Sequence, residues 1–540
     1  MGESLGGPVG LALAARRSGA LLRVTVSNAS HRGGSMQRAR QWREFIGAHG
    51  MAAWAEMMTP LRLDRARVPD GQWRRFARAQ AEASPDSVLD LADLLIGADL
   101  WPVLPAIAVP TLLPAPAQSP SVPPAVTEEI HAAICGSALR VFADARHGLP
   151  CSHGAACGRA LRSFLTGPPP PPREPMSLSP AGVDAIAALL DALLPALDHV
   201  EWVQRHLFPP RAPTLAERLE SRAPVLAAAL TALEAVEWPD DLRALRERLV
   251  TVSRQTLDLI GAFGRAAAEG EPIGLYRALR RLAPLLEGLY PLYPLLTPVS
   301  RWFLEADRRE DEALVERLHA GALREDDLRA GVLHSQNERG DRGGVSLYVP
   351  ETLAAGRPAP LIVALHGGSG HGRDFLWAWL REARTRGALL LAPTAQERTW
   401  SIMGGQDVDA PRLVAAVEAV AQRYPVDRAR VLLTGMSDGA TYALLAGLAP
   451  GVPFTHLAPA CGVLHPYLLA EGGIANARGR PIYLVHGALD WMFPVQTARM
   501  ARQALEAAGA RLVYREIEDL SHTYPRDENA RILDWLTGPV

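Results

Sequence analysis

A serine, an aspartate and a histidine stand in the last third of the sequence, where each could take part in nucleophilic catalysis. Ser437 is the centre of Gly435-Met436-Ser437-Asp438-Gly439, and Asp490 and His522 follow it in that order. A free serine hydroxyl is a poor nucleophile at neutral pH, but a neighbouring histidine can activate it by accepting its proton. A carboxylate bonded to that histidine holds the correct tautomer and stabilises the imidazolium ion. These residue types predict a triad that attacks a carbonyl carbon.

A glycine-rich loop upstream of the serine adds a second requirement of this chemistry. When serine attacks an acyl carbon, the carbonyl oxygen becomes negative and needs preorganised N–H donors. Gly367 and Gly368 follow an apolar run, and glycine lets the backbone approach a ligand closely. We expect Gly367 or Gly368 to supply one donor of the oxyanion hole and the backbone of Asp438 the other. Taken alone, the loop is equally typical of an ordinary strand-to-helix turn.

Short apolar strands that alternate with helices are the elements that must position these residues. Strands are predicted at 360–365, 388–393, 430–434, 454–459, 481–485 and 511–516. Near-continuous apolar runs separated by helices are typical of a mostly parallel sheet covered on both faces, so the fold class is α/β. Asp490 by itself could cap a helix, and His522 could be a surface residue. The joint occurrence of all three residues after strands favours catalysis.

Residues from about 345 to 540 resemble α/β-hydrolases of the bacterial esterase, phospholipase/carboxylesterase and polyhydroxybutyrate-depolymerase-like group. The matching segments are His366-Gly367-Gly368, Gly435-Met436-Ser437-Asp438-Gly439, His486-Gly487-Ala488-Leu489-Asp490 and Ser521-His522-Thr523-Tyr524-Pro525. The resemblance implies that Ser437 is the nucleophile, Asp490 the acid and His522 the base. It covers little over a third of the chain, and it is specific for fold and reaction rather than for the substrate.

A second elbow of the same kind stands at Gly2-Glu3-Ser4-Leu5-Gly6, and Arg146-His147-Gly148 resembles the loop that carries the base. Residues 2–166 therefore resemble the second half of another α/β-hydrolase. The expected position of its acid carries Ser119 and no carboxylate, and no oxyanion loop stands before Ser4. We expect this segment to be inactive. A degenerate remnant, a misplaced start codon and a half sheet that borrows a partner's edge are the open explanations.

Two changes in composition divide the chain. Gly167 and the prolines at 168–172 predict a polyproline linker, and a polar turn at 337–344 separates two short strands, 331–336 and 345–349. Between them, helices are predicted at 183–194, 225–236, 241–268, 275–283 and 311–318. We therefore predict four segments: a partial hydrolase-like segment (1–166), a linker (167–176), a helical region (177–335) and a catalytic α/β-hydrolase domain (336–540).

The overall composition argues against several classes of protein. The net charge is −2 without blocks of like charge, which gives no support for nucleic acid or an acidic membrane as a partner. The chain has no lysine, so lysine Schiff bases and a Walker lysine are excluded. The four cysteines lack CxxC spacing, and the prolines within 100–126 are incompatible with a spanning helix. With no signal-peptide pattern at the start, we expect a cytoplasmic protein without an integral membrane segment, metal or organic cofactor.

Cleavage of a small-molecule carboxylic ester through an acyl-enzyme is the function that these observations predict. A non-catalytic scaffold built on a hydrolase fold is an alternative, because well over half of the chain has no catalytic signature. The same triad could also serve acyl transfer or peptide cleavage, since one fold supports many reactions. The acyl length, the alcohol group, the oligomeric state and the role of the helical region are left open by the sequence.

Overall fold

The computed structural model describes residues 1–16, 21–33, 42–119, 122–170, 178–239, 242–322, 330–354 and 356–538. Contacts within the chain divide it into two units. Unit 1 comprises Met1–Ser179 and Trp238–Arg246, and unit 2 comprises Pro180–Glu237 and Glu247–Val540. Residues 171–176 of the predicted linker lie outside the described residues.

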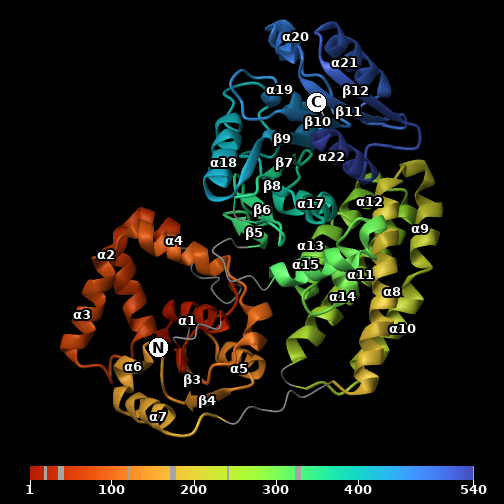
Figure 1. Ribbon diagram of the computed structural model, residues 1–540. Helices are drawn as coiled ribbons and strands as arrows, with labels where there is room; N and C mark the ends of the chain where they lie inside the picture. Colours follow the sequence, from red (N-terminus) through yellow and green to blue (C-terminus); the bar gives the residue numbers. More distant parts are fainter. Residues whose placement is uncertain are drawn as a thin grey trace. The chain divides into compact units, whose positions relative to one another are not determined.

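Unit 2 contains an eight-stranded sheet in the order β12-β11-β10-β9-β7-β8-β6-β5 (Figure 1). Its strands are β5 (Gly331–Ser335), β6 (Val345–Val349), β7 (Ala359–Leu365), β8 (Leu389–Pro393), β9 (Val426–Met436), β10 (His456–Ala460), β11 (Pro481–Gly487) and β12 (Arg511–Ile517). β6 pairs antiparallel with β5 and β8, and the other pairs are parallel. The six predicted strands and the α/β class are thus confirmed. The sheet begins at β5, before the boundary predicted at residue 336.

The strand order explains why two distant loops can meet. β7 lies between β8 and β9, so the chain leaves β7 toward one side of the sheet and leaves β9 toward the other. Open α/β sheets bind ligands beyond the carboxyl ends of their strands at such a switch point. The loops that follow β7 and β9 therefore lie beside each other at the carboxyl edge of the sheet.

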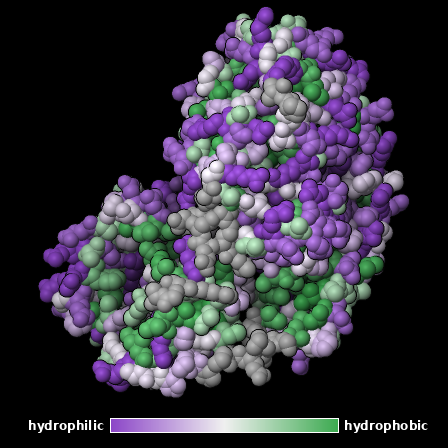
Figure 2. Space-filling view, in the orientation of Figure 1, coloured by the Kyte–Doolittle hydropathy of each residue, from purple (hydrophilic) through white to green (hydrophobic). Residues whose placement is uncertain are grey.

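Helices cover both faces of this sheet. They are α16 (Gly372–Phe375), α17 (Leu380–Arg386), α18 (Ala410–Arg423), α19 (Asp438–Gly447), α20 (Pro466–Ala470), α21 (Val495–Ala507) and α22 (Asn529–Thr537). α18 buries Leu413, Val417 and Val420, which share one helical face, and its opposite face is polar. Hydrophilic residues accordingly cover most of the face of unit 2 seen in Figure 2, with smaller apolar patches between them.

The helical region contains eight α-helices among the described residues. They are α8 (Pro180–Arg205), α9 (Ala212–Glu220), α10 (Ala223–Glu234), α11 (Arg243–Glu269), α12 (Pro272–Leu279), α13 (Leu282–Leu289), α14 (Thr297–Trp302) and α15 (Glu312–Ala322). α8 and α10 lie side by side (Figure 1). By length and composition alone α8 could cross a membrane, but buried core helices pass the same test. Here α8 contributes Asp198, which accepts a hydrogen bond of 2.9 Å from Trp302 of α14.

One helix prediction in this region is wrong. Residues 275–283 were expected to form a single helix, but α12 ends at Leu279 and α13 starts at Leu282. Pro284 lies in the first turn of α13. A proline has no N–H to donate and its ring clashes with the carbonyl four residues earlier, so the helix restarts shortly before it. The start of the helix predicted from residue 241 lies outside the described residues.

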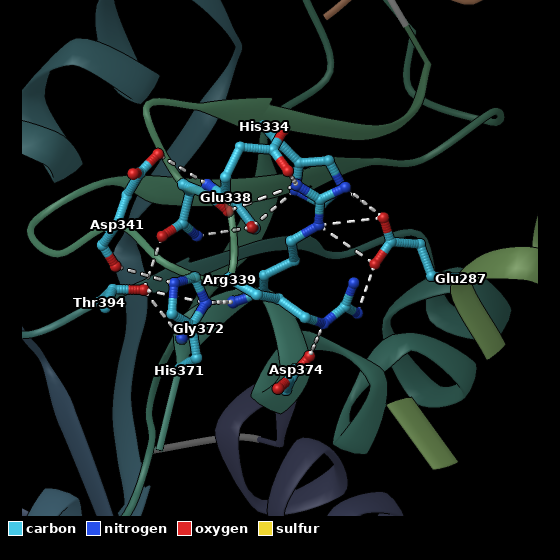
Figure 3. Close-up of polar contacts among 12 residues, drawn as sticks. Glu287, His334, Glu338, Arg339, Asp341, His371, Gly372, Asp374 and Thr394 are labelled. Atoms are coloured by element: carbon cyan, nitrogen blue, oxygen red, sulfur yellow. Dashed lines mark hydrogen bonds and ion pairs between the residues drawn. The ribbon is translucent and has the colours of Figure 1, made fainter. Parts of the chain in front are cut away.

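An ion-pair cluster attaches the helical region to the sheet of unit 2 (Figure 3). Glu287 of α13 accepts a hydrogen bond of 2.6 Å from Arg339 and one of 3.0 Å from Nε of Arg373. Arg339 also donates to Asp374, at 2.8 Å. Because the three elements share one network of charges, α13 is held against the loop between β5 and β6 and against α16.

A buried ion pair makes a second connection. Arg384 of α17 and Glu351, which follows β6, have fully buried side chains with Nε and Oε1 3.1 Å apart. Arg384 also donates to the Ser300 carbonyl of α14 at 2.8 Å, and Tyr290 donates to Glu351 at 2.9 Å. Both charges therefore have partners from the helical region as well as from the sheet.

Replacing Arg384 with methionine should destabilise the protein by about 3–5 kcal/mol, because it leaves the Glu351 carboxylate buried without its countercharge. The double change Arg384→Met with Glu351→Gln should recover part of this loss. Arg428→Met, which removes an exposed pair with Glu418, is the control and should cost about 1 kcal/mol or less. Urea unfolding curves measure all three, and equal effects of Arg384→Met and Arg428→Met would contradict the argument.

Unit 1 contains a four-stranded parallel sheet in the order β1-β2-β3-β4. Its strands are β1 (Gly2–Glu3), β2 (Val24–Ser27), β3 (Thr111–Pro116) and β4 (Ser137–Phe142). Its helices are α1 (Gly6–Ala15), α2 (Trp42–Arg62), α3 (Asp70–Ala81), α4 (Pro85–Ile96), α5 (Pro124–Ala133), α6 (Leu149–Ser152) and α7 (Gly154–Thr166). The order and direction of these strands repeat those of β9 to β12 in unit 2.

Candidate active site

Ser437 occupies a sharp turn between β9 and α19. Its backbone has φ +56° and ψ −120°, a conformation that residues other than glycine rarely adopt. The flanking glycines are needed for steric reasons. A Cβ atom on Gly435 would lie 2.5 Å from the Gly439 carbonyl oxygen, and one on Gly439 would lie 2.5 Å from that of Leu365. The pentapeptide thus lifts the Ser437 hydroxyl off the carboxyl edge of the sheet.

The structure brings the three residues singled out in the sequence into one hydrogen-bonded chain. Ser437 Oγ lies 3.0 Å from Nε2 of His522, and Nδ1 of His522 lies 2.8 Å from Oδ2 of Asp490. His522 and Asp490 are 4% and 5% exposed, so bulk water competes little for these bonds. Nδ1–H can donate to the carboxylate while Nε2 accepts the serine proton, which is the arrangement that general-base catalysis requires.

Backbone groups fix the orientation of the acid and the base. Asp490 Oδ1 accepts from the N–H groups of Met492 at 3.0 Å and Phe493 at 2.8 Å, which leaves Oδ2 for the histidine. The Phe493 ring packs edge-on against His522. A Cβ atom on Gly487 would lie 2.2 Å from the Leu520 carbonyl oxygen. The end of β11 and the histidine loop therefore approach closely because residue 487 has no side chain.

The loop after β7 lies directly against the serine turn. A Cβ atom on Gly367 would lie 3.4 Å from that of Ser437, and one on Gly368 would lie 2.5 Å from the Asp438 carboxylate. Asp438 is the first residue of α19, so its N–H has no acceptor within the helix. The loop after β7 and the start of α19 therefore lie close together beside Ser437.

His366 holds the loop in place as a neutral imidazole. Its Nδ1–H donates to the Gly367 carbonyl at 2.7 Å, and its Nε2 accepts from the Ala395 N–H at 3.1 Å. Trp400 donates to the His366 carbonyl at 2.7 Å. Burial lowers the pKa of His366 to about 3, so both bonds persist through the neutral range.

The depressed pKa of His366 predicts a loss of stability in acid. Between pH 6.5 and about 3, the unfolded chain binds a proton at this residue and the folded chain does not, so stability falls as the pH falls. The expected slope from this group is about 1.4 kcal/mol per pH unit. His366→Gln lacks it, and its urea-unfolding free energy should fall less steeply between about pH 6 and 4. Parallel curves for variant and wild type would contradict this role.

The helical region contacts the loop that carries His522 and the loop that follows β7. Tyr276 of α12 donates to the His522 carbonyl at 3.2 Å and accepts from Nε1 of Trp491 at 3.3 Å. Arg280, which follows α12, lies 3.5 Å from the Gly368 carbonyl oxygen. Helical periodicity in the sequence gave no sign of these contacts, because it reports which residues are apolar and not which polar residue reaches a distant loop.

Unit 1 places its own serine and histidine together. Ser4 Oγ lies 2.8 Å from Nε2 of His147, and Nδ1 of His147 lies 3.3 Å from the hydroxyl of Ser119. The sequence singled out all three positions, and the structure joins them with serine where the acid was expected.

A family model described as Phospholipase/Carboxylesterase matches residues 409–537. This range includes Ser437, Asp490 and His522 and excludes the loop at 367–368. A comparison with curated proteins found no match.

Solved structures align with a little over a third of the chain. A thermostable esterase is 20% identical over 38% of this chain and 62% of its own, with a TM-score of 0.32. The Staphylococcus aureus fluorophosphonate-binding serine hydrolase F is 15% identical over 38% of this chain and 98% of its own, with a TM-score of 0.33. Esterase PE8 is 22% identical over 36% of this chain and 98% of its own, with a TM-score of 0.30. The chain thus spans less than two thirds of the first of these structures.

Proposed function

We propose that the carboxyl-terminal part of this chain, an α/β-hydrolase of the carboxylesterase type, cleaves carboxylic esters through a covalent acyl-serine. The observation that carries the proposal is the bonded chain from Ser437 through His522 to Asp490, beside a glycine-rich loop. The catalytic domain then begins at β5, includes the strands and helices up to α22, and carries the helical region over its catalytic loops.

In the acylation step, Ser437 Oγ attacks the ester carbonyl carbon while its proton passes to Nε2 of His522. The carbonyl oxygen becomes negative and is stabilised by the N–H of Asp438 and an N–H of the Gly367–Gly368 loop. When the tetrahedral intermediate collapses, the carbon–oxygen bond to the alcohol breaks and His522 returns its proton to the departing alcohol. The product of this step is an ester between the acyl group and Ser437.

In the deacylation step, water replaces the alcohol. His522 Nε2 accepts a proton from the water, whose oxygen attacks the acyl carbon, and the same N–H donors stabilise the second oxyanion. Collapse releases the carboxylic acid and returns the proton to Ser437 Oγ. Throughout both steps Asp490 stabilises the positive charge on His522, to which it is bonded at 2.8 Å.

The contacts of Tyr276 and Arg280 give the helical region a part in this proposal. Tyr276 buttresses the main chain of His522, and Arg280 reaches the oxyanion loop. Burial raises the pKa of Tyr276 to about 12, so its hydroxyl stays protonated and can keep donating to the His522 carbonyl. We propose that the region serves as a cap that stabilises both loops.

The proposal is tested by labelling the full chain with a fluorophosphonate and mapping the modified peptide by mass spectrometry. The expected result is one stoichiometric adduct on Ser437, together with hydrolysis of p-nitrophenyl esters of graded acyl length. Folded protein that neither labels at Ser437 nor hydrolyses any ester of the series would instead indicate a non-catalytic scaffold. Labelling at Ser437 without turnover of simple esters would direct attention to acyl transfer or peptide cleavage.

A further inference from the structure

Unit 1 reproduces the serine turn of unit 2 in its backbone. Ser4 has φ +51° and Ser437 has φ +56°, both in the left-handed region. Each serine donates its N–H to the end of the next strand, to Ser27 and to Ala460 respectively, at 3.0 Å. Gly2 is as crowded as Gly435, because a Cβ atom there would lie 2.0 Å from the carbonyl oxygen four residues later. Such strain persists only where the surrounding structure enforces it.

The correspondence continues along the neighbouring strands. Asn28 after β2 has φ +56°, and Cys461 after β10, at the same place in unit 2, has φ +53°. Asn28 donates its side-chain amide to the His147 carbonyl at 2.6 Å, so it holds the histidine loop against the turn. The loop of unit 1 is therefore fixed by a buried side chain.

The hydrogen bonds give His147 an oriented imidazole. Val122 N–H donates to Ser119 Oγ at 3.2 Å, and this bond fixes the Ser119 hydroxyl beside Nδ1 of His147. With Nδ1–H donating to Ser119, the lone pair of Nε2 faces Ser4 Oγ at 2.8 Å. His147 and Ser119 are buried and Ser4 is only partly buried, so a reagent can reach the serine.

We propose that Ser4 is a second nucleophile of this chain, with His147 as its base and Ser119 as the residue that positions His147. The site takes the acyl group of activated esters or thioesters. This inference goes beyond the ester hydrolysis proposed for Ser437 and does not depend on it, because the two sites share no residue.

Two differences from Ser437 set the substrate class. Ser119 is neutral, so it can orient the imidazole but does not stabilise the imidazolium as a carboxylate does, which slows attack by Ser4. Around Gly6 a Cβ atom would meet nothing within 4 Å, whereas at Gly439 it would meet the oxyanion-loop backbone. Among the described residues, the Leu5 N–H is therefore available as an oxyanion donor, but no loop faces it to supply the second. The loss of one such donor lowers kcat about 10²–10³-fold. Only a substrate with a good leaving group compensates for the missing charge and the missing donor.

The step is an ordinary substitution at the acyl carbon. Ser4 Oγ forms a bond to the carbonyl carbon, its proton passes to Nε2 of His147, and the bond to the thiolate or aryloxide breaks with its electron pair on the leaving group. The leaving group then takes the proton from His147. Burial, together with the nearby Arg62, lowers the pKa of His147 to about 4, so the imidazole is neutral at pH 7 but is a weak base, which is a further reason for a good leaving group.

Fluorophosphonate labelling of the full-length Ser437→Ala variant tests the proposal. The Ser4 oxygen–phosphorus bond forms as the phosphorus–fluorine bond breaks, and fluoride leaves. Peptide mass spectrometry should find the adduct on Ser4, formed about 10³–10⁵-fold more slowly than the Ser437 adduct of the wild type. Ser4→Ala in the same background should abolish it. A folded Ser437→Ala protein with no adduct on Ser4 after exhaustive exposure would overturn the proposal.

Variants of the positioning residue separate catalysis from structure. Ser119→Asp in the Ser437→Ala background should raise the Ser4 labelling rate tenfold or more, because a carboxylate then stabilises the imidazolium. Ser119→Ala should lower the rate about tenfold. If Ser119 served packing alone, Ser119→Asp would give no gain, and that result would remove Ser119 from the site. In the wild type, an adduct on Ser437 is detected on a different peptide from an adduct on Ser4. The absence of labelling at one serine can therefore be distinguished from its absence at the other.

Discussion

In a Ser4→Ala background, ester hydrolysis by the Ser437→Ala variant is expected to be about 10⁶-fold slower in kcat than hydrolysis by the protein that keeps Ser437. The substitution removes the nucleophilic oxygen of this site, and it leaves His522 and Asp490 with their mutual hydrogen bond of 2.8 Å. The oxyanion donors and the bound substrate still act on a water molecule, so a residual rate above the uncatalysed reaction is also expected. Initial rates with a short p-nitrophenyl ester measure the change, and KM should stay near that of the wild type.

Ser221→Ala is the matched control for this measurement. Ser221 is an exposed residue after α9 whose hydroxyl bonds to the carbonyl of Arg218 in the same turn, so its loss should leave kcat unchanged. Equal thermal unfolding of the two variants would show that the Ser437 effect is chemical. A Ser437→Ala protein that retained more than a hundredth of the wild-type kcat would place the nucleophile elsewhere.

The centre of the sheet of unit 2 could be predicted because β7, β8, β10 and β11 are almost wholly buried and read as largely apolar runs. The ends of these strands in turn located Ser437 and the histidine loop. The glycines around Ser437 made the serine turn recognisable, because they have steric roles that no other residue fills. Strand pairing was not predictable in the same way. The position of β8 between β6 and β7 depends on crossovers that the local sequence does not encode.

The helical region shows where prediction from the sequence stops. Periodicity locates α8, α10 and α15, but Pro284 divides one predicted helix into two. The contacts that matter for the site come from Tyr276 and Arg280, polar residues whose partners lie about 90 or more positions away. A single sequence carries no signal for such pairs, because each residue is equally at home on a solvated helix surface.

Unit 1 raises a question of chemistry rather than of fold, and its inactivity stays a prediction that the proposal for Ser4 opposes. The absence of a carboxylate near residue 119 predicted an inactive segment, since the argument required a charge at that place. The structure shows that a hydroxyl can occupy the hydrogen-bonding role of the acid toward His147, at 3.3 Å, without its electrostatic role. Orientation and charge stabilisation are separable functions of the third residue of a triad, and a search for carboxylates alone detects only their combination.

The Asp490→Asn variant removes both functions at Ser437, because the amide is neutral and reverses the tautomer of His522, and its kcat is expected to fall about 10⁴-fold. The backbone N–H groups of Met492 and Phe493 donate to Oδ1, so the asparagine oxygen should remain in that place and turn its NH₂ group toward His522. Nδ1 of His522 must then accept a hydrogen bond, which puts the ring proton on Nε2. An imidazole in that tautomer donates to Ser437 Oγ and has no lone pair there to take its proton.

Measurement of kcat, of KM and of the fluorophosphonate rate at Ser437 distinguishes this tautomer effect from a loss of folding. We expect kcat and the labelling rate to fall together while KM and the thermal unfolding midpoint change little, because the amide has the shape of the carboxylate. Asp427→Asn, near the start of β9, is the matched control: Asp427 is half-buried and accepts from the Ala429 N–H, and its variant should behave as the wild type. An Asp490→Asn enzyme with more than a tenth of the wild-type kcat would mean that the neutral partner suffices, and the low rate expected at Ser4 beside Ser119 would then be due to its oxyanion side alone.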